Sequence, residues 1–438
     1  MKIKASKALS PFFLDGWSIS KNLEFDVDYV EPRQFLKAER LDLVSKLYYI
    51  ECREKGNDCT LAKELYTEFI RAFSLGSFIE PGTETKDSIE KYFEEFDILI
   101  DNVKEIGLSA NKSVIPVGEN GSILDGSHRT ALAIYFGKKL PVIYISGVTK
   151  TYDYMYFKDR GMPQKYLDFA VQKYIEYADL CYVACLWPRA RGANKQKKVE
   201  MLIHKSTNVV CKRQIKLNYN GLRQLMIQIY GNQEWAGTME NGFSGIPVKA
   251  KACYDLKGLT TVYVLEGNDL EHILELKAQI RDIFKINNHS IHITDTKEEA
   301  MEAARILFNE HSIALLKFGN IIVDNDIKNH MITKEINLQE NCLSCDFTKM
   351  LFQLIKINQI KTLWMKIDKN STPIDFGYVY GMSFPSLEKC NLSIKERICF
   401  HLKCFRYGCI LDFAMQLQIK RKIRQLVGMV LRKIGVIR

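Results

Sequence analysis

The sequence predicts an α+β protein in which helices and short strands follow one another along most of the chain. Apolar residues recur at helical spacing through residues 36–106. Shorter segments at 114–117, 141–145 and 290–294 have the composition or the alternation of strands. With 438 residues, 47% of them hydrophobic, the chain can bury well-formed cores, and its length favours two or three domains.

The composition is moderately basic, because 62 Lys and Arg residues against 52 Asp and Glu residues give a net charge of +10. The sequence has no N-terminal apolar signal segment and no run of about 18 uncharged apolar residues, so neither secretion nor membrane spanning is indicated. The 12 cysteines follow no regular spacing, which favours reduced thiols. We therefore expect a cytoplasmic protein.

The N-terminal third is predicted to be largely helical before its strands begin. The spacing of apolar residues predicts helices over 35–54, 60–73 and 87–106. A Pro-Gly pair predicts a loop over 76–85.

A short turn sequence, Asp125-Gly-Ser-His-Arg129, lies between a predicted strand at 114–117 and a predicted helix at 131–136. Another strand follows at 141–145. Gly126 lets the backbone approach a ligand closely, and the arginine with the free amides of a helix start supplies positive charge. The alternative is an ordinary Asp-Gly turn whose serine caps the helix.

This series of strand, hairpin, turn and helix resembles the fold shared by sulfiredoxin and the N-terminal domain of ParB partition proteins. In that fold a Gly-x-His-Arg turn binds nucleotide phosphates, and its members include kinases. The resemblance implies catalytic roles for Asp125 and His128, and phosphate contacts for Gly126, Ser127 and Arg129. The run from residue 40 to 135 also resembles proteins of bacterial capsule and O-antigen gene clusters, which implies a role in surface-polysaccharide synthesis.

A second informative stretch, Leu276–Phe308, joins a helix, a strand with an ionisable residue and another helix. The alternation of side chains in the strand places His292 on its polar face with Ser290 and Thr294. The histidine is therefore not expected in the core of the strand. The alternative to a functional role is a histidine that is hydrogen-bonded at a strand end.

Polar residues after this strand predict a capping box at the start of the next helix: Thr294, Asp295, Glu298 and Glu299. Amide groups at such a helix start bind anions. Lys277 and Arg281 are spaced i,i+4, so they place two cations on one face of the preceding helix.

The run from Lys277 to Ala300 looks like the end of a nucleoside diphosphate kinase domain, where an arginine-bearing segment precedes the strand with the phosphorylated histidine. By that likeness His292 takes up a phosphoryl group, while Lys277, Arg281 and Thr294 contact nucleotide phosphate. The likeness spans residues 180–312, in which strands and helices follow in the order of that family. Trp187 stands where the family has its phosphate-binding lysine, so we expect phosphate contact by His292 rather than covalent phosphorylation.

The C-terminal part carries weaker patterns. Residues 313–326 predict strands, and Cys342 and Cys345 allow a zinc hypothesis, but the later cysteines and histidines are irregularly spaced and we predict no metal site. The segment 416–438 has an apolar helical face and seven positive charges without an acid. It suits the surface of an anionic membrane, and the alternative is a helix docked on the protein itself.

The predicted organisation has five parts: a ParB/sulfiredoxin-like domain with N-terminal helices (1–150), a linker (151–179), a ferredoxin-like, nucleoside diphosphate kinase-like α/β sandwich (180–312), a mixed, mostly helical region (313–415) and a basic tail (416–438). We expect a nucleotide-dependent phosphotransferase that acts on a small hydroxyl, sugar or alditol substrate, with ATP or another nucleoside triphosphate and Mg²⁺ as cofactors. The alternative is a non-catalytic nucleotide sensor, docked on the inner face of the cell membrane beside glycan-synthesis enzymes. Nucleic acid is not an expected partner, because no basic recognition helix follows the ParB-like part.

Overall fold

The computed structural model describes residues 1–318, except 81, 83–84, 111–112, 239–240, 242 and 268, together with 374, 376–379 and 382–385. The chain forms two compact units. The first consists of Met1–Tyr182, Thr207–Cys211 and Val264–Asn268, and the second begins with Val183–Ser206, Lys212–Tyr263 and Asp269. The predicted zinc cysteines and the basic tail at 416–438 lie outside the described residues.

The N-terminal segment is a small layer of short elements: β1 (Lys2–Lys4), α1 (Ala5–Ala8), α2 (Pro11–Gly16) and β2 (Glu24–Asp26). β1 and β2 pair antiparallel. Ala5 and Leu14 share a buried apolar cluster with Ile143, which belongs to the main sheet of this unit. The segment is therefore anchored on that sheet.

The main sheet of the first unit has three strands in the order β3-β5-β4: β3 (Asp28–Val30), β5 (Leu140–Tyr144) and β4 (Ile115–Val117). β3 pairs antiparallel with β5, whereas β4 and β5 are parallel. Parallel neighbours need a crossover connection. Here the crossover contains α6 (Ser127–Phe136), which follows β4 in the chain and precedes β5.

Helices surround α6. They are α3 (Leu43–Glu54), α4 (Thr60–Phe73) and α5 (Ile89–Ile106), with a 3-10 turn η1 at Pro32–Phe35. α3 contacts both α4 and α6, and α5 contacts α6. The predicted helix at 60–73 is confirmed. The helix predicted to begin at 35 begins only at Leu43, and the one predicted from 87 begins at Ile89, after the capping hydroxyl of Ser88.

The segment expected to link two domains, 151–179, contains two helices, α7 (Tyr154–Asp159) and α8 (Gln164–Tyr177). Both fall within the first unit. α8 contacts α3 and α4 and buries one apolar side, including Leu167 and Tyr174. Apolar burial of this kind holds the segment as part of a core.

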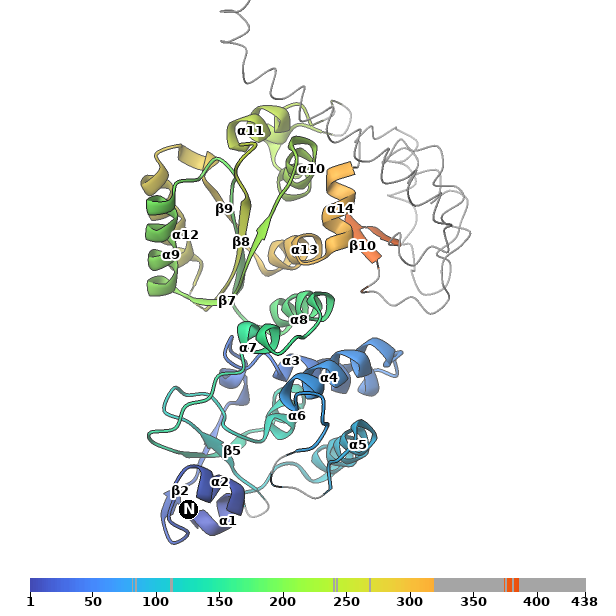
Figure 1. Cartoon of the computed structure of the whole chain (residues 1–438), viewed down its shortest axis with the longest axis vertical. Helices are drawn as coiled ribbons and strands as arrows, with labels where there is room; N and C mark the ends of the chain where they lie inside the picture. The colour runs from blue at the N-terminus through green and yellow to red at the C-terminus, as the bar shows by residue number, and fades with distance from the viewer. Residues whose placement is uncertain are drawn as a thin grey trace, which may run out of the picture. The chain divides into compact units, whose positions relative to one another are not determined.

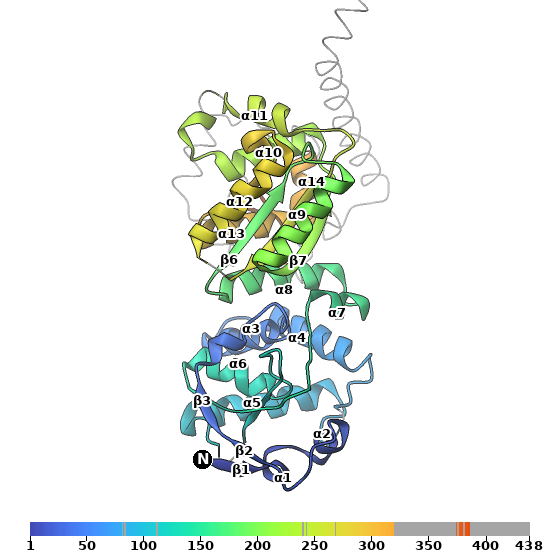
Figure 2. The ribbon, with the colours of Figure 1, turned by 90° about the vertical axis from the view of Figure 1, so that its left-hand side faces the viewer.

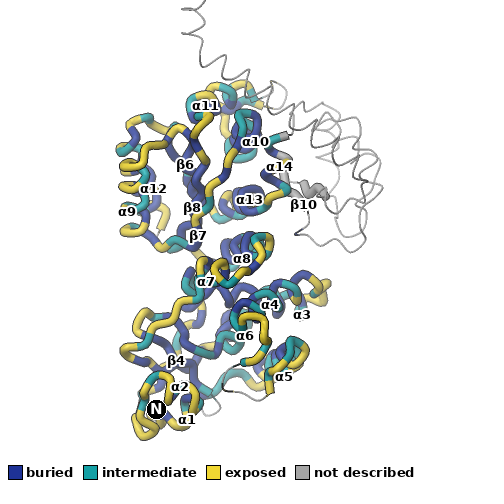
Figure 3. Tube along the Cα trace, in the orientation of Figure 1, coloured by how far each residue is buried: buried dark blue, intermediate teal, exposed yellow. Residues whose placement is uncertain are grey.

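Most of the second unit surrounds a four-stranded sheet in the order β7-β8-β6-β9, of which the first residues of β6 and β7 and the last residues of β8 are grouped with the first unit. The strands are β6 (Cys181–Leu186), β7 (Asn208–Ile215), β8 (Thr260–Glu266) and β9 (Ile291–Ile293). β9 pairs antiparallel with β6, and His292 lies opposite Cys185. β6 and β8 are buried along nearly their whole length (Figure 3), as expected for strands covered on both faces.

Helices cover both faces of this sheet. α9 (Ala193–Ser206) and α12 (Leu270–Phe284) lie on one face, and α10 (Tyr219–Tyr230), α13 (Lys297–Leu307) and α14 (Glu310–Phe318) lie on the other (Figures 1 and 2). The remaining elements are α11 (Ile246–Cys253), the 3-10 turns η2 (Glu234–Ala236) and η3 (Asn287–His289), and the hairpin of β10 (Phe376–Val379) and β11 (Met382–Pro385). The prediction of a strand from residue 313 is wrong for residues 313–318, because these residues belong to the helix α14.

The start of α13 also differs from its prediction. Thr296 is the N-cap, and its hydroxyl accepts a hydrogen bond from the Glu299 backbone N–H. The Glu299 carboxylate accepts one from the Asp295 backbone N–H at 2.9 Å. The capping pattern is thus present but is centred on Thr296 rather than on Thr294.

The fold is therefore mixed α/β with several small sheets, which confirms the predicted α+β class at that level. Among the described helices, none combines the length and the apolar character needed to cross a membrane.

Candidate functional site

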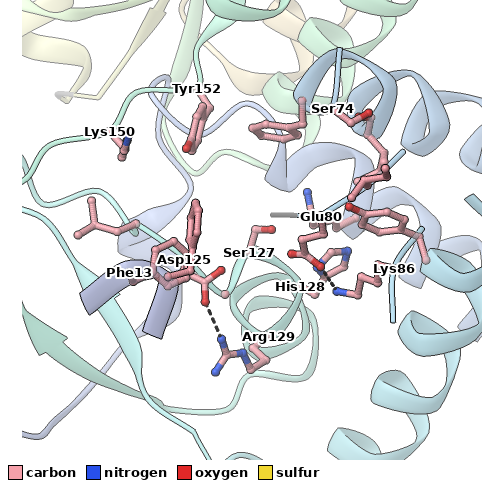
Figure 4. A pocket seen from close by; sticks show the side chains of 18 of the residues that line it. Phe13, Ser74, Glu80, Lys86, Asp125, Ser127, His128, Arg129, Lys150 and Tyr152 are labelled. Carbon is pink, nitrogen blue, oxygen red and sulfur yellow. Dashed lines mark hydrogen bonds and ion pairs between the residues drawn. The ribbon is translucent and has the colours of Figure 1, made fainter. Parts of the chain in front are cut away.

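A large cavity lies in the first unit and contains the Asp125–Arg129 turn. Its volume is about 880 Å³, within the range of small-molecule sites. Its lining comes from α2, from the ends of α3 and α4, from the 74–86 segment, from α5, and from residues 124–129 and 150–160. Figure 4 shows the labelled side chains around the cavity, with Asp125, Ser127, His128 and Arg129 at the start of α6.

Gly126 shapes the start of α6. It is the N-cap residue, it adopts a left-handed conformation with φ +79°, and no side chain caps the first amides of the helix. The Gly126 carbonyl accepts hydrogen bonds from the Thr130 backbone N–H and hydroxyl. The left-handed φ favours glycine, and a Cβ atom at 126 would also require the ends of the Ile115 and Arg129 side chains to shift. The uncapped first turn of α6 adjoins the cavity, the geometry of an anion site.

Asp125 and Arg129 flank this helix start as an ion pair, with Arg129 Nη2 3.3 Å from Asp125 Oδ2. Arg129 Nη1 also donates to the Val114 carbonyl at 3.4 Å. Burial lowers the pKa of Arg129, and the Asp125 carboxylate opposes that effect. The guanidinium remains charged, because the ordinary pKa of arginine lies far above neutral pH.

His128 lies beside the helix start and is held by Tyr66. The ring Nε2 shares a 2.7 Å hydrogen bond with the Tyr66 hydroxyl, and the ring meets Phe96 edge to face. Burial, with further contributions from Lys46 and Lys86, lowers the pKa of His128 well below its ordinary value. The ring is therefore neutral at physiological pH and does not add positive charge to the cavity.

The cavity lining carries six basic and three acidic side chains: Arg40, Lys46, Lys86, Arg129, Lys150 and Arg160 against Glu80, Glu95 and Asp125. Arg40 and Lys46 are buried and share one carboxylate. Arg40 Nε lies 2.8 Å and Lys46 Nζ 3.1 Å from Asp42. Burial opposes ionisation of Asp42, but the two cations outweigh it and hold its pKa below its ordinary value. This excess of positive charge suits an anionic ligand.

One side of the cavity is aromatic. Phe13 and Trp17 of the N-terminal segment stack with ring centroids 4.6 Å apart. Phe73, Tyr152 and Tyr156 line the cavity as well, and the Arg160 guanidinium lies 4.2 Å from the Tyr156 ring centroid. Aromatic faces of this kind can contact a planar ring of a ligand.

The residues predicted from the second stretch lie in the second unit. His292 is on β9, with Ile291 and Ile293 buried on either side of it in sequence, as the alternation predicted. Its ring meets Tyr230 edge to face at 5.0 Å. Burial, with Lys277, Lys249 and Arg281 nearby, lowers the pKa of His292 to about 3. The ring is neutral, as a nucleophilic imidazole must be.

The three predicted phosphate contacts of this stretch have different surroundings. Lys277 Nζ donates to the Ile293 carbonyl and to Asp295, each at 3.0 Å. The Thr294 hydroxyl is buried and accepts from the Val183 backbone N–H at 2.9 Å. Arg281 Nε is buried and makes no hydrogen bond within the described structure. Of the three, Arg281 is thus the one whose buried donor lacks a partner among the described residues.

Several cavity residues were not found from the sequence: Arg40, Lys46, Glu80 and Lys86. One of them carried a signal. Lys46 stands on the apolar face of α3, three residues after Leu43 and four before Ile50, where a charge needs a partner. Glu80 and Lys86 belong to an irregular segment without periodicity.

The described residues contain no group of three or more His, Cys, Asp and Glu side chains that could hold a metal ion. Comparisons with models of protein families, with curated proteins and with solved structures found no match to this chain.

Proposed function

We propose that the first unit binds the phosphate groups of a nucleotide at the start of α6 and transfers a phosphoryl group to a small hydroxyl, sugar or alditol substrate. The observation that carries the proposal is the uncapped, glycine-initiated first turn of α6, which adjoins a cavity of about 880 Å³ with six basic side chains in its lining. Backbone amides and cations together are the usual means of binding phosphate.

The roles of the individual residues follow from their positions. The amides of Ser127 and His128 would bind phosphate oxygens, and the Arg129 guanidinium would offset their charge. Gly126 lets the ligand approach the backbone. His128, neutral and bonded to Tyr66, would fix the shape of the turn. Asp125 has a partly exposed carboxylate beside the helix start, which fits a ligand of a nucleotide-bound cation.

The cofactors fit these side chains. Mg²⁺ is commonly held by nucleotide phosphates with only one or two carboxylates, so a dedicated cluster of ligands is not required. When bound, it would offset the charge that develops on the transferring phosphoryl group. Asp125 lies at the helix start itself and is the carboxylate of the lining best placed for this purpose (Figure 4).

The wider assignments rest on resemblance. The parallel β4–α6–β5 connection supports a ParB/sulfiredoxin-like fold for the first unit. The order β7-β8-β6-β9 supports a ferredoxin-like sheet for the second, where Arg281 and His292 would contact a second phosphate. The similarity of residues 40–135 to proteins of capsule and O-antigen gene clusters supports surface-polysaccharide synthesis as the pathway. The basic tail supports docking on an anionic membrane.

The test is a search for product. The purified protein is mixed with Mg²⁺, with ATP or CTP, and with glycerol, ribitol or a sugar phosphate, and the mixture is examined by mass spectrometry. We expect a new phosphate ester together with a nucleoside diphosphate. Nucleotide binding without any product from this panel would favour the alternative, a nucleotide sensor that partners glycan-synthesis enzymes.

A further inference from the structure

Glu80 occupies a position in the cavity that phosphate binding alone does not explain. It lies in the segment between α4 and α5, and its Oε2 atom forms an ion pair with Lys86 Nζ at 2.8 Å. The Glu80 backbone N–H donates to the Lys86 carbonyl at 3.0 Å, so the two residues are fixed relative to each other. Figure 4 shows the pair beside His128 and Ser127, facing the start of α6.

The carboxylate of Glu80 is central among the groups around the cavity. Burial lowers the pKa values of Lys46 on α3 and Arg129 on α6, and the negative charge of Glu80 opposes this effect in both residues. It also contributes to the raised pKa values of Tyr66 and Tyr92, after burial. These residues come from four helices, α3, α4, α5 and α6.

A carboxylate in this place opposes the binding of an anion, because like charges repel most strongly where water is partly excluded. The other acids of the lining have simpler roles. Asp125 is paired with Arg129 at the phosphate site itself, and Glu95 lies 3.6 Å from Lys86 at the side of the cavity. The Glu80 side chain lines the cavity and is 33% exposed, although its Oε2 atom beside Lys86 is buried.

We propose that Glu80 is the general base that accepts the proton of the acceptor hydroxyl; this rests on the proposed phosphoryl transfer. The hydroxyl oxygen forms a bond to the terminal phosphorus of the nucleoside triphosphate. The bond from that phosphorus to the bridging oxygen breaks, the hydroxyl proton passes to the Glu80 carboxylate, and the nucleoside diphosphate leaves. Glu80 lines the same cavity as the first residues of α6, so an acceptor bound there could contact both the carboxylate and the bound nucleotide.

Glu80→Gln tests the proposal in the full-length protein. Glutamine still accepts the hydrogen bond of Lys86 but cannot act as a base at neutral pH. Glu95→Gln is the matched control, because it removes an acid from the same cavity and from the same lysine. The measurements are the Kd for ATP by calorimetry and kcat with the acceptor from the panel that gives most product.

For Glu80→Gln we expect kcat to fall by at least about 100-fold, the usual contribution of a general base, with the Kd for ATP within about 3-fold of wild type. Glu95→Gln should keep kcat within about 3-fold of wild type. Glu80→Asp keeps the carboxylate but shortens the side chain by one methylene group. Its kcat should lie between those of the wild type and Glu80→Gln, and its Kd for ATP should equal that of the wild type.

Wild-type kcat in Glu80→Gln would overturn the proposal, and so would a loss of ATP affinity as large as the loss of kcat, since Glu80 would then only hold Lys86. If Glu80→Gln does not fold, Glu80→Asp decides: a reduced kcat at unchanged Kd supports the base, and an unchanged kcat refutes it. If the wild-type protein forms no product with any pair, phosphotransfer itself fails and the role of Glu80 fails with it.

Discussion

The backbone at Gly126 passes so close to Ile115 that a Cβ atom at position 126 would clash with Ile115 Cδ1 and lie 2.9 Å from Arg129 Nη2. The Ile115 side chain of strand β4 is thus packed directly against the start of α6, and a methyl group at 126 would require this side chain and that of Arg129 to move. The contact fixes where the first amides of α6 point, and with them the proposed phosphate site.

Gly126→Ala should therefore lower stability and abolish nucleotide binding. Gly137→Ala is the control, because Gly137 ends the same helix with a left-handed φ of +62° but a Cβ atom there would enter open space, with no neighbouring atom within 4 Å. Both changes should carry the left-handed strain of about 1–2 kcal/mol, and only Gly126→Ala adds the clash. Thermal melts and ATP titrations measure the two effects. Equal behaviour of the two variants would contradict a special role for the Gly126 contact.

Arg129→Ala removes the guanidinium that adjoins this helix start. We expect ATP affinity to fall by roughly 1.5–3 kcal/mol, the range for hydrogen bonds to charged groups. The control is Arg53→Ala, since Arg53 pairs with Asp97 and Asp101 and does not line the cavity. Calorimetric titration compares the three proteins. An unchanged Kd in Arg129→Ala would remove the arginine from the site.

The Asp42 carboxylate balances the charges of the buried Arg40 and Lys46 side chains. Replacing it with Asn leaves Arg40 and Lys46 as buried cations without a counter-charge, and breaking a buried ion pair in this way costs about 3–5 kcal/mol. Asp101→Asn, at an exposed pair with Arg53, should leave stability nearly unchanged. Urea unfolding measures both. A stability of Asp42→Asn close to that of wild type would mean that the cations find other partners.

The spacing of apolar residues predicted those helices in which one face is buried without interruption. The helix Thr60–Phe73 was predicted to the residue because its apolar positions, from Leu61 to Ile70, follow helical spacing without interruption. The helix at 35–54 was placed too early. Leu36 and Leu41 are buried as expected, but they lie before the helix: Leu36 follows a 3-10 turn, and Leu41 lies between the ion-paired Arg40 and Asp42. The spacing of apolar residues cannot distinguish this burial from that of a helix.

A short apolar run explains the error at 313–318. From its sequence, such a run can form either a buried strand or a helix. In the structure it forms the helix α14, which packs against α10. The same limit applies to the candidate site. The Asp125–Arg129 turn was visible because its residues are contiguous, whereas Arg40, Lys46 and Glu80 meet it only through tertiary packing.

His292 provides a pH-dependent test in the second unit. Its pKa is about 3 in the folded protein against an ordinary value of 6.5, so between these values the unfolded chain binds a proton that the folded chain does not. The neutral ring therefore stabilises the fold above pH 6.5, and this contribution is lost progressively as the pH falls toward 3. His128 shifts in the same direction, so the comparison with a His292 variant is needed to separate the two.

We expect His292→Gln to lose less stability on acidification than the wild-type protein. Because one proton changes unfolding free energy by about 1.4 kcal/mol per pH unit, the difference between the two proteins should change by roughly 2 kcal/mol between pH 6.5 and pH 5. Urea unfolding in a background with both Trp17→Phe and Trp364→Phe measures this, since the remaining Trp187 and Trp235 then report on the second unit. Stability curves that stay parallel over this range would show that His292 binds its proton in the folded protein as readily as in the unfolded chain.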